Sequence, residues 1–379
     1  MLAKAIRFVC YSTLLLVASL AISGCKKPPV QSNEILIGEY GSLTGSTAVF
    51  GQGTHKGIML AVDEVNAAGG LLGKPVRVIT EDDEGNQDEA VSVVKKLIDL
   101  DGVIGVLGEV ASTRSLAGGG VCEDEHVPMI SPSSTNPDVT KDRKYVFRVC
   151  FTDDFQGSVG AQFAVKQGWK KVAVLSSANS DYSKKLSYFF TQTFSQSGQI
   201  AAAETYNDGD TDFAPQLTGI RAAAPDAVYL PGYYTEIDLI LKQARDLGIT
   251  CPFFGGDGWD GVTLDKTSEG CYFTNHYSPE DPRPSVQTFI KSYEAKYNGE
   301  VPDAFGITGY DAANVMFDAI KRANSTDREA ITAAIASTTN FPGAGGSITI
   351  DANHNAKKPI CILEITGGKT HLADTIQPQ

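Results

Sequence analysis

Most of this chain alternates between short apolar segments and amphipathic helices, a pattern that few architectures can accommodate. The first apolar segment covers residues 35–38, and others follow at 76–80, 103–107, 128–130 and 145–149. The helix expected after the first segment carries apolar residues at the i, i+3, i+4 and i+7 spacing of a buried face: Ile58, Ala61, Val62 and Val65. Short apolar strands separated by such helices predict a parallel sheet covered on both faces.

The same pattern restarts at Gln156. Further strands are expected at 171–175, 200–205, 227–230 and 252–255, again with helices between them. Three more helices precede a final stretch of strands, and 379 residues are enough for two domains. We therefore expect an α/β protein with two doubly wound parallel-sheet lobes. The ligand cleft should lie between the lobes, at the carboxyl ends of the strands.

The loops after four of these strands carry polar side chains that together suit a zwitterion. Ser112 follows the third strand of the first block, and Ser133 and Thr135 follow the fourth. Tyr233 and Asp257 follow the last two strands of the second block. Hydroxyls and main-chain N–H groups near helix starts favour a carboxylate, whereas an acid beside a phenol favours an ammonium group. The alternative is structural, with the hydroxyls as helix caps and Asp257 as a turn residue.

The start of the chain has the features of an export signal. Two basic residues precede an apolar run at 8–22, shorter than the roughly 20 residues that cross a bilayer and suited to a secretory signal. The run ends in ISGC at 22–25, which resembles a bacterial lipobox. We expect a signal peptide at 1–24, lipid attachment at Cys25 and a polar tether over 25–34. The alternative is an ordinary cleaved signal that contains a cysteine.

Five cysteines remain in the expected mature chain besides the acylated Cys25, and exported proteins can keep disulfides. Cys251 and Cys271 flank two strands that are close in sequence, so they are the best candidates for a disulfide. Cys122 and Cys150 are a weaker pair, and Cys361 lies in an apolar strand as an expected free thiol. Neither the cysteines nor the five histidines have metal-site spacing, so we expect no metal.

Composition and motifs exclude several other functions. The net charge is -13 and no basic patch is present, which argues against nucleic-acid binding. Gly51, Gly53 and Gly57 follow a strand, but their spacing fits neither nucleotide-binding fingerprint. No G-x-S-x-G elbow and no nucleophile–base set can be recognised. We expect a binding protein without a cofactor rather than an enzyme.

Several segments resemble the leucine/isoleucine/valine-binding protein family, the substrate-binding subunits of ATP-driven amino-acid importers. The likeness is carried by residues 38–85 and by GEVASTRS at 108–115, ISPSSTNPDVT at 130–140, VYLPGYYTE at 228–236 and FFGGDGW at 253–259. It extends over essentially the whole expected mature chain, more loosely in the last hundred residues. Periplasmic binding proteins close around their ligands by hinge motion.

The resemblance implies a role for each of ten residues. Those that would bind the ligand carboxylate are Ser112, Ser133 and Thr135, and those that would bind its ammonium group are Asp257 and Tyr233. Those that would form or adjoin the side-chain pocket are Phe50, Val110, Tyr182, Trp259 and Phe305.

The resemblance also implies the type I two-lobe fold with a multi-strand hinge. One lobe would contain 34–153 and about 281–330, and the other 154–280 and about 331–379. The protein would be a monomeric, lipid-anchored receptor of the bacterial cell envelope. It would capture a free amino acid, branched-chain or otherwise apolar, and deliver it to the membrane permease subunits of the importer.

Two departures from the family leave the ligand open. Asp257 stands where the best-known branched-chain members have glutamate, and Trp259 adds bulk beside it. One alternative is a receptor or sensor of the same fold for an amide, a urea-like compound or an aromatic acid, although such relatives usually lack the ammonium-binding acid. The other alternative is an enzyme that uses the cleft, which the missing nucleophile and metal ligands oppose.

Overall fold

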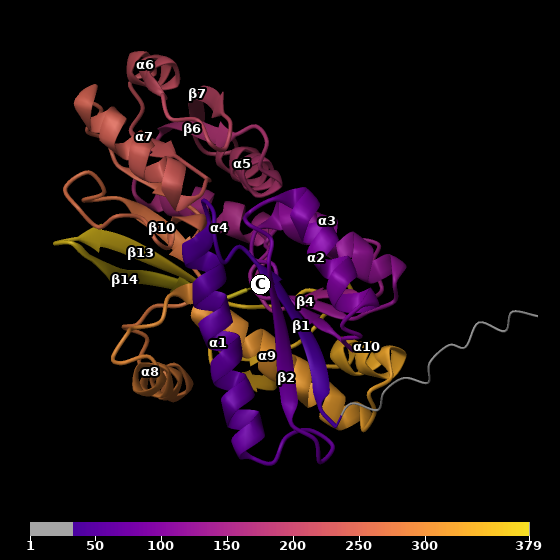
Figure 1. Ribbon diagram of the computed structural model, residues 1–379. Helices are drawn as coiled ribbons and strands as arrows, with labels where there is room; N and C mark the ends of the chain where they lie inside the picture. Colours follow the sequence, from indigo (N-terminus) through magenta and orange to yellow (C-terminus); the bar gives the residue numbers. More distant parts are fainter. Residues whose placement is uncertain (1–32, 379) are drawn as a thin grey trace, which may run out of the picture. The chain divides into compact units, whose positions relative to one another are not determined.

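The computed structural model describes residues 33–378, and two separate β-sheets organise this part of the chain (Figure 1). The expected signal peptide, the lipid site at Cys25 and most of the expected tether lie outside the described residues. None of the helices within 33–378 is long and apolar enough to cross a membrane. Both sheets are combined with helices, which confirms the α/β class.

The first sheet is entirely parallel and has the strand order β2-β1-β3-β4-β5. Its strands are β1 (Ile35–Gly41), β2 (Val76–Asp82), β3 (Val106–Leu107), β4 (Met129–Ser131) and β5 (Val146–Arg148). Since β1 is flanked by β2 and β3, the order reverses there, as in doubly wound sheets. The carboxyl ends of β1, β3 and β4 therefore meet at one edge.

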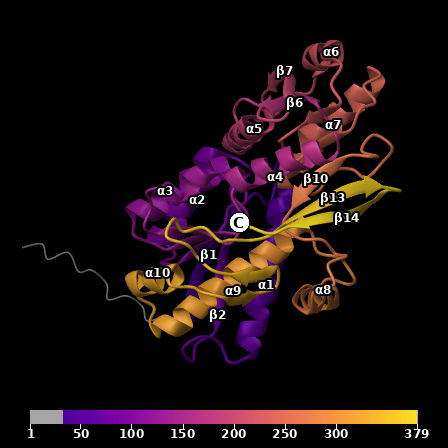
Figure 2. The ribbon, with the colours of Figure 1, turned by 180° about the vertical axis from the view of Figure 1, so that it is seen from behind.

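The second sheet has the order β14-β13-β10-β9-β8-β6-β7. Its parallel strands are β6 (Lys171–Ser177), β7 (Gln199–Tyr206), β8 (Ala227–Tyr229), β9 (Phe253–Gly255) and β10 (Tyr272–Asn275). The last two, β13 (Ile360–Thr366) and β14 (Lys369–Ile376), join it antiparallel (Figure 2). A small antiparallel pair forms apart, from β11 (Phe341–Gly343) and β12 (Gly346–Ile348).

The helices lie between the strands as the sequence pattern predicts. In the first half they are α1 (Ala48–Ala67), α2 (Gln87–Asp99), α3 (Ser112–Asp124), α4 (Asp153–Lys166) and α5 (Asp181–Phe194). In the second half they are α6 (Ala214–Ala223), α7 (Tyr234–Asp246), α8 (Pro284–Lys296), α9 (Ala304–Ala323) and α10 (Arg328–Ala336). Two short 3-10 turns, Pro137–Val139 and Asp257–Trp259, follow β4 and β9.

Helices α1 and α9 pack side by side at unusually close range (Figure 1). A Cβ atom on Gly57 of α1 would lie 1.9 Å from the carbonyl oxygen of Gly306 in α9, and one on Gly309 would lie 2.5 Å from the carbonyl oxygen of Thr54. Glycine is therefore required for these two backbones to approach. Gly57 and Gly309 thus serve helix packing. The contact brings the starts of both helices together, where the rings of Phe50 and Phe305 meet.

The final hundred residues are shared between the two sheets. Ile331, Ile335, Ile348 and Ala356 are buried in one cluster with β1, α1 and α9, whereas β13 pairs with β10 of the second sheet. The range 331–379, expected in the second lobe, thus includes residues up to Ala356 that pack with the first sheet. These residues join the first sheet because the apolar face of α10 packs on α9.

Candidate functional site

A small closed cavity lies where polar ends of strands from both sheets meet. Its volume is about 10 Å³, room for about one water molecule. Its lining residues are Phe50, Val110, Ser133, Thr135, Tyr182, Tyr233, Asp257, Gly258 and Phe305. Eight of these nine were predicted from the sequence, and they come from segments as far apart as α1 and α9. The exception is Gly258, which follows Asp257 directly.

The first sheet contributes hydroxyl groups to this cavity. Ser133 and Thr135 follow β4; the Ser133 hydroxyl lies 2.7 Å from the Thr308 hydroxyl, and the Thr135 hydroxyl is buried without a hydrogen bond of good geometry within the described chain. Ser112 is not among the lining residues, and its Oγ accepts a 3.2 Å hydrogen bond from the main-chain N–H of Asn136. Ser112 instead begins α3, so its main-chain N–H belongs to a helix N-terminus.

The second sheet contributes a buried carboxylate. Asp257 begins the short turn after β9 and is 4% exposed. Gln156 Nε2 lies 2.8 Å from one carboxylate oxygen, and His276 Nε2 lies 3.0 Å from the other. An ionised carboxylate has about four lone-pair sites, so two held oxygens can still accept hydrogen bonds from a ligand.

Aromatic rings form the remaining wall of the cavity. The rings of Phe50 and Phe305 lie 4.2 Å apart between centroids, and those of Tyr182 and Tyr233 stack at 5.3 Å. The Phe50 ring also meets Tyr233 edge-on at 5.7 Å. Burial raises the pKa of both tyrosines, so both phenols stay neutral and can donate hydrogen bonds. The wall therefore suits an apolar group beside the polar ends.

Hydrogen bonds join the two sides of the cavity at its rim. Asn136 Nδ2 donates to the carbonyl oxygen of Asp181 at 2.9 Å, and the Asp181 N–H donates to the Thr113 hydroxyl at 3.0 Å. Lys185 forms an ion pair with Asp138 at 2.6 Å. Each pair joins a segment that follows β3 or β4 of the first sheet to α5 of the second sheet, so these contacts hold the two sides of the cavity together.

The family follows from residues 34–369, which match the description "Periplasmic binding protein". The chain belongs to the periplasmic binding protein family. It is 32% identical over 348 residues to the Leu/Ile/Val-binding protein BraC3 of Rhizobium johnstonii, covering 89% of this chain and 91% of that protein. It is 29% identical to a leucine-, isoleucine-, valine-, threonine- and alanine-binding protein of Pseudomonas aeruginosa over 90% of this chain and 92% of that one.

Solved structures agree with the two-lobed type I architecture of this periplasmic binding protein. The leucine binding protein LivK from Thermotoga maritima has 39% identity and a TM-score of 0.86, covering 91% of this chain and 99% of that chain. LivJ from Streptococcus pneumoniae, in complex with isoleucine, has 34% identity and a TM-score of 0.86, covering 91% and 100%. The resemblance to branched-chain amino-acid binding proteins is thereby confirmed.

Trp259 does not adjoin the cavity of this periplasmic binding protein, contrary to expectation. Its ring is fully buried in the core of the second sheet and stacks on Phe273 with centroids 6.3 Å apart. Its indole N–H donates to the carbonyl oxygen of Leu230 at 2.8 Å. The turn that begins at Asp257 places residues 257 and 259 on opposite sides, so proximity in sequence was misleading.

The expected disulfide is also absent from the described residues, where Cys251 and Cys271 are free thiols. Arg245 contacts both segments instead, donating to the carbonyl oxygen of Cys251 at 3.1 Å and to Cys271 Sγ at 3.6 Å. Burial raises the pKa of Cys271 to about 11, so this thiol stays protonated. Cys361 is a buried free thiol, as predicted. Cys122 and Cys150 are also buried free thiols, so the weaker expected pair is wrong as well.

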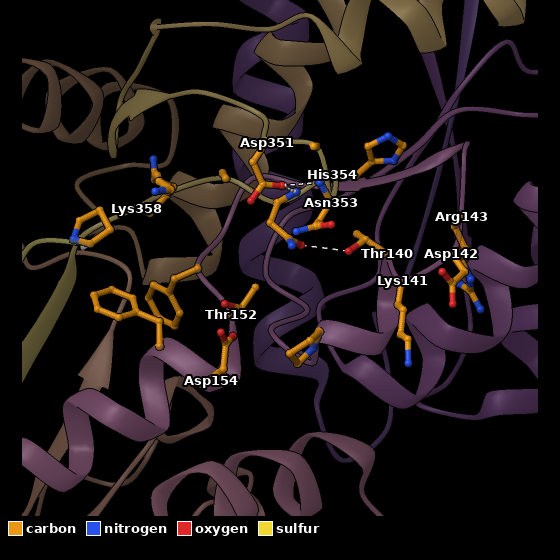
Figure 3. Close-up of a pocket in the computed structure, with 18 of the residues that line it drawn as sticks. Thr140, Lys141, Asp142, Arg143, Thr152, Asp154, Asp351, Asn353, His354 and Lys358 are labelled. Atoms are coloured by element: carbon orange, nitrogen blue, oxygen red, sulfur yellow. Dashed lines mark hydrogen bonds between the residues drawn. The ribbon is translucent and has the colours of Figure 1, made fainter. Parts of the chain in front are cut away.

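A second, larger concavity of about 1170 Å³ lies among the loops at 137–144, 151–155 and 351–358 (Figure 3). Its charged side chains have both signs, and several are engaged in local contacts. Asn355 accepts from the Thr140 hydroxyl at 2.9 Å, and the Asp351 carboxylate accepts from the main-chain N–H of Asn353 at 2.8 Å. The predicted ligand residues all lie elsewhere, so volume alone does not make this concavity the candidate site.

A buried ionic network supports the loops of the first sheet. Glu109 accepts from the Ser42 hydroxyl at 2.8 Å and from Arg114 Nε at 3.2 Å. One oxygen of Asp83 lies 3.0 Å from the same hydroxyl oxygen, and its second carboxylate oxygen has no partner among the described residues. Burial, together with the charge of Glu109, raises the pKa of Asp83 to about 7.

Because this pKa is raised on folding, ionising Asp83 should destabilise the native state. The protonated carboxyl group of Asp83 favours the native state fully below about pH 4, and this contribution to stability is lost as the pH rises towards about 7. We expect Asp83→Asn to reduce the loss of unfolding free energy between about pH 4 and pH 8 by about 2 kcal/mol. Urea unfolding at both pH values measures this difference, and parallel pH profiles for variant and wild type would contradict the assignment.

Proposed function

We propose that this protein is the substrate-binding subunit of an ABC importer for a free L-amino acid, branched-chain or otherwise apolar. The observation that carries the proposal is a single enclosed cavity with hydroxyls on one side, a carboxylate on the other and aromatic rings between them. A zwitterion with an apolar side chain matches this arrangement at all three points. Binding, rather than catalysis, is also the function of the family.

Each part of the ligand would have its own receptor. The carboxylate would be bound by the hydroxyls of Ser133 and Thr135 and by main-chain N–H groups at the start of α3, where Ser112 lies. The ammonium group would be bound by Asp257, with the Tyr233 phenol beside it. Each charged end of the ligand needs a partner in the site, because a buried charge without a partner costs several kcal/mol.

The side chain of the ligand would lie against Phe50 and Phe305. These rings are brought together by the close α1–α9 contact. Aromatic faces pack well against aliphatic groups and carry no conventional hydrogen-bond donor or acceptor. The isoleucine bound by the S. pneumoniae relative has such a side chain.

Ligand entry would require the two sides of the cavity to separate, because the enclosed volume of about 10 Å³ holds about one water molecule. The hydrogen bonds of Asn136 and Thr113 to Asp181 would then break on opening and form again on closing. A closed, ligand-bound form would be the one that the permease subunits recognise. A lipid at Cys25 would keep the receptor beside them in the cell envelope.

A thermal-shift screen tests the function. Residues 26–379 would be melted with each common L-amino acid, with the corresponding amides, and with benzoate, which an R. palustris protein of the same fold binds. At a hundred times its dissociation constant a ligand stabilises the native state by about 2.7 kcal/mol. We expect stabilisation by leucine, isoleucine or valine. Stabilisation by compounds without an amino group alone would replace this proposal with the amide or aromatic-acid receptor.

A further inference from the structure

Both oxygens of the Asp257 carboxylate already lie within hydrogen-bond distance of side chains that no sequence motif indicated. Gln156 on α4 lies 2.8 Å from Oδ1, and His276 lies 3.0 Å from Oδ2. The same Gln156 amide also donates to the Thr274 hydroxyl at 2.9 Å. Side chains of all three residues, Gln156, Asp257 and His276, are buried. The carboxylate therefore has a fixed orientation within the site.

His276 is itself held rigidly in place. Its ring stacks on Phe151 with centroids 4.2 Å apart and 23° between the planes, and it meets the cavity residue Phe305 at 6.4 Å. Its main-chain N–H donates to Asn275 Oδ1 at 2.8 Å. A ring fixed by stacking and by its backbone loses little freedom when it donates a hydrogen bond, so the contact with Asp257 is preorganised.

The two adjacent residues at the end of β10 hold two different carboxylates. His276 contacts Asp257, while Asn275 Nδ2 donates to Asp260 Oδ2 at 3.1 Å. Asp260 Oδ2 also accepts from the main-chain N–H of Ala304, next to Phe305, at 2.8 Å. The end of β10 thus links the carboxylate side of the cavity to the start of α9, which carries the aromatic wall.

We propose that His276 is a positioning residue that makes the site selective for ligands with a free ammonium group. By donating to Oδ2 it holds the Asp257 carboxylate towards the cavity while leaving lone pairs for the ligand. A carboxylate that was free to rotate would bind the ammonium group with poorer geometry. This inference rests on the proposed amino-acid binding and adds the residue that enforces its selectivity.

The test compares L-leucine with 4-methylpentanoate, which is leucine without its amino group. His276→Phe keeps a ring against Phe151 but removes the donor nitrogen. We expect it to weaken leucine binding by about tenfold and to change 4-methylpentanoate binding by less than about twofold. His276→Gln keeps an N–H donor and should recover most of the leucine affinity. His371→Phe makes the same change at an exposed histidine and should alter neither affinity.

Calorimetry on the purified full-length mature protein gives both affinities, and a double variant provides a second measurement. His276→Phe added to Asp257→Asn should cost no further leucine affinity, since it acts through Asp257. Equal weakening of both ligands by His276→Phe, or additive losses in the double variant, would overturn the inference. His276→Leu carries the same expectations should the phenylalanine variant not fold. A wild type that binds neither leucine nor 4-methylpentanoate would contradict the proposed function itself.

Discussion

Replacing Asp257 by alanine is expected to weaken amino-acid binding by about a hundredfold or more. The Asp257 carboxyl group is buried in the lining of the cavity, where it would bind the ligand's ammonium group. Removing one partner of a buried charge pair costs about 2–5 kcal/mol. The loss would also leave the donors Gln156 and His276 without their acceptor. Isothermal titration with the amino acid identified in the thermal screen measures the effect.

Two further variants serve as a control and as an intermediate case. Asp246→Ala removes an exposed carboxylate on α7 and should leave the affinity unchanged. Asp257→Asn keeps the shape of the side chain but removes its charge. Its affinity for the amino acid should therefore lie between the affinities of the wild type and of Asp257→Ala. If Asp257→Ala bound the amino acid as tightly as the wild type, Asp257 would not be the ammonium receptor.

Among the substitutions considered for their effect on stability, Gly57→Ala should cause the largest loss of unfolding free energy. The added Cβ would lie 1.9 Å from the carbonyl oxygen of Gly306, so two helix backbones must move apart. Overpacking of this kind costs about 1–3 kcal/mol and sometimes more. We expect about 3 kcal/mol and a fall of at least about 5 °C in melting temperature. Ligand affinity should fall too, because the shift separates Phe50 from Phe305.

The matched control is Gly120→Ala in α3. Its added Cβ would come no closer than 3.9 Å to another atom, the tip of Arg143. Alanine is a better helix former than glycine, so this change should be neutral or stabilise by up to about 1 kcal/mol. Equal melting temperatures for the Gly57 and Gly120 variants would show that the α1–α9 contact can relax without cost.

The residues at the ends of parallel strands could be predicted because topology alone brings them together. Thr135 and Asp257 are 122 positions apart in the printed sequence, yet each follows a parallel strand whose carboxyl end faces the same cavity. The regular spacing of apolar residues such as Ile58 and Val65 likewise indicated the helices. Where a rule of sheet topology or helix period applies, the sequence is sufficient to predict where a residue lies in the fold.

Other features depend on contacts that no periodic rule describes. His276 and Gln156 both reach Asp257, but neither lies in a recognisable motif, and Gln156 is 101 positions away in the sequence. Trp259 was misplaced because two residues separated by one position in a tight turn can face opposite directions. Residues 331–356 joined the first sheet through the packing of α10 on α9, a tertiary preference that the local pattern does not contain.

The way in which the chain shares its last residues between both sheets affects when it can fold. The core around β1 includes Ile350 and Ala356, and the cores around β8 and β9 include Ile362 and Ile365. A ribosome makes these residues after all the other members of both cores, so neither core of a nascent chain is complete before residues 350–365 have been synthesised. We therefore expect neither sheet to fold stably before this segment has been made.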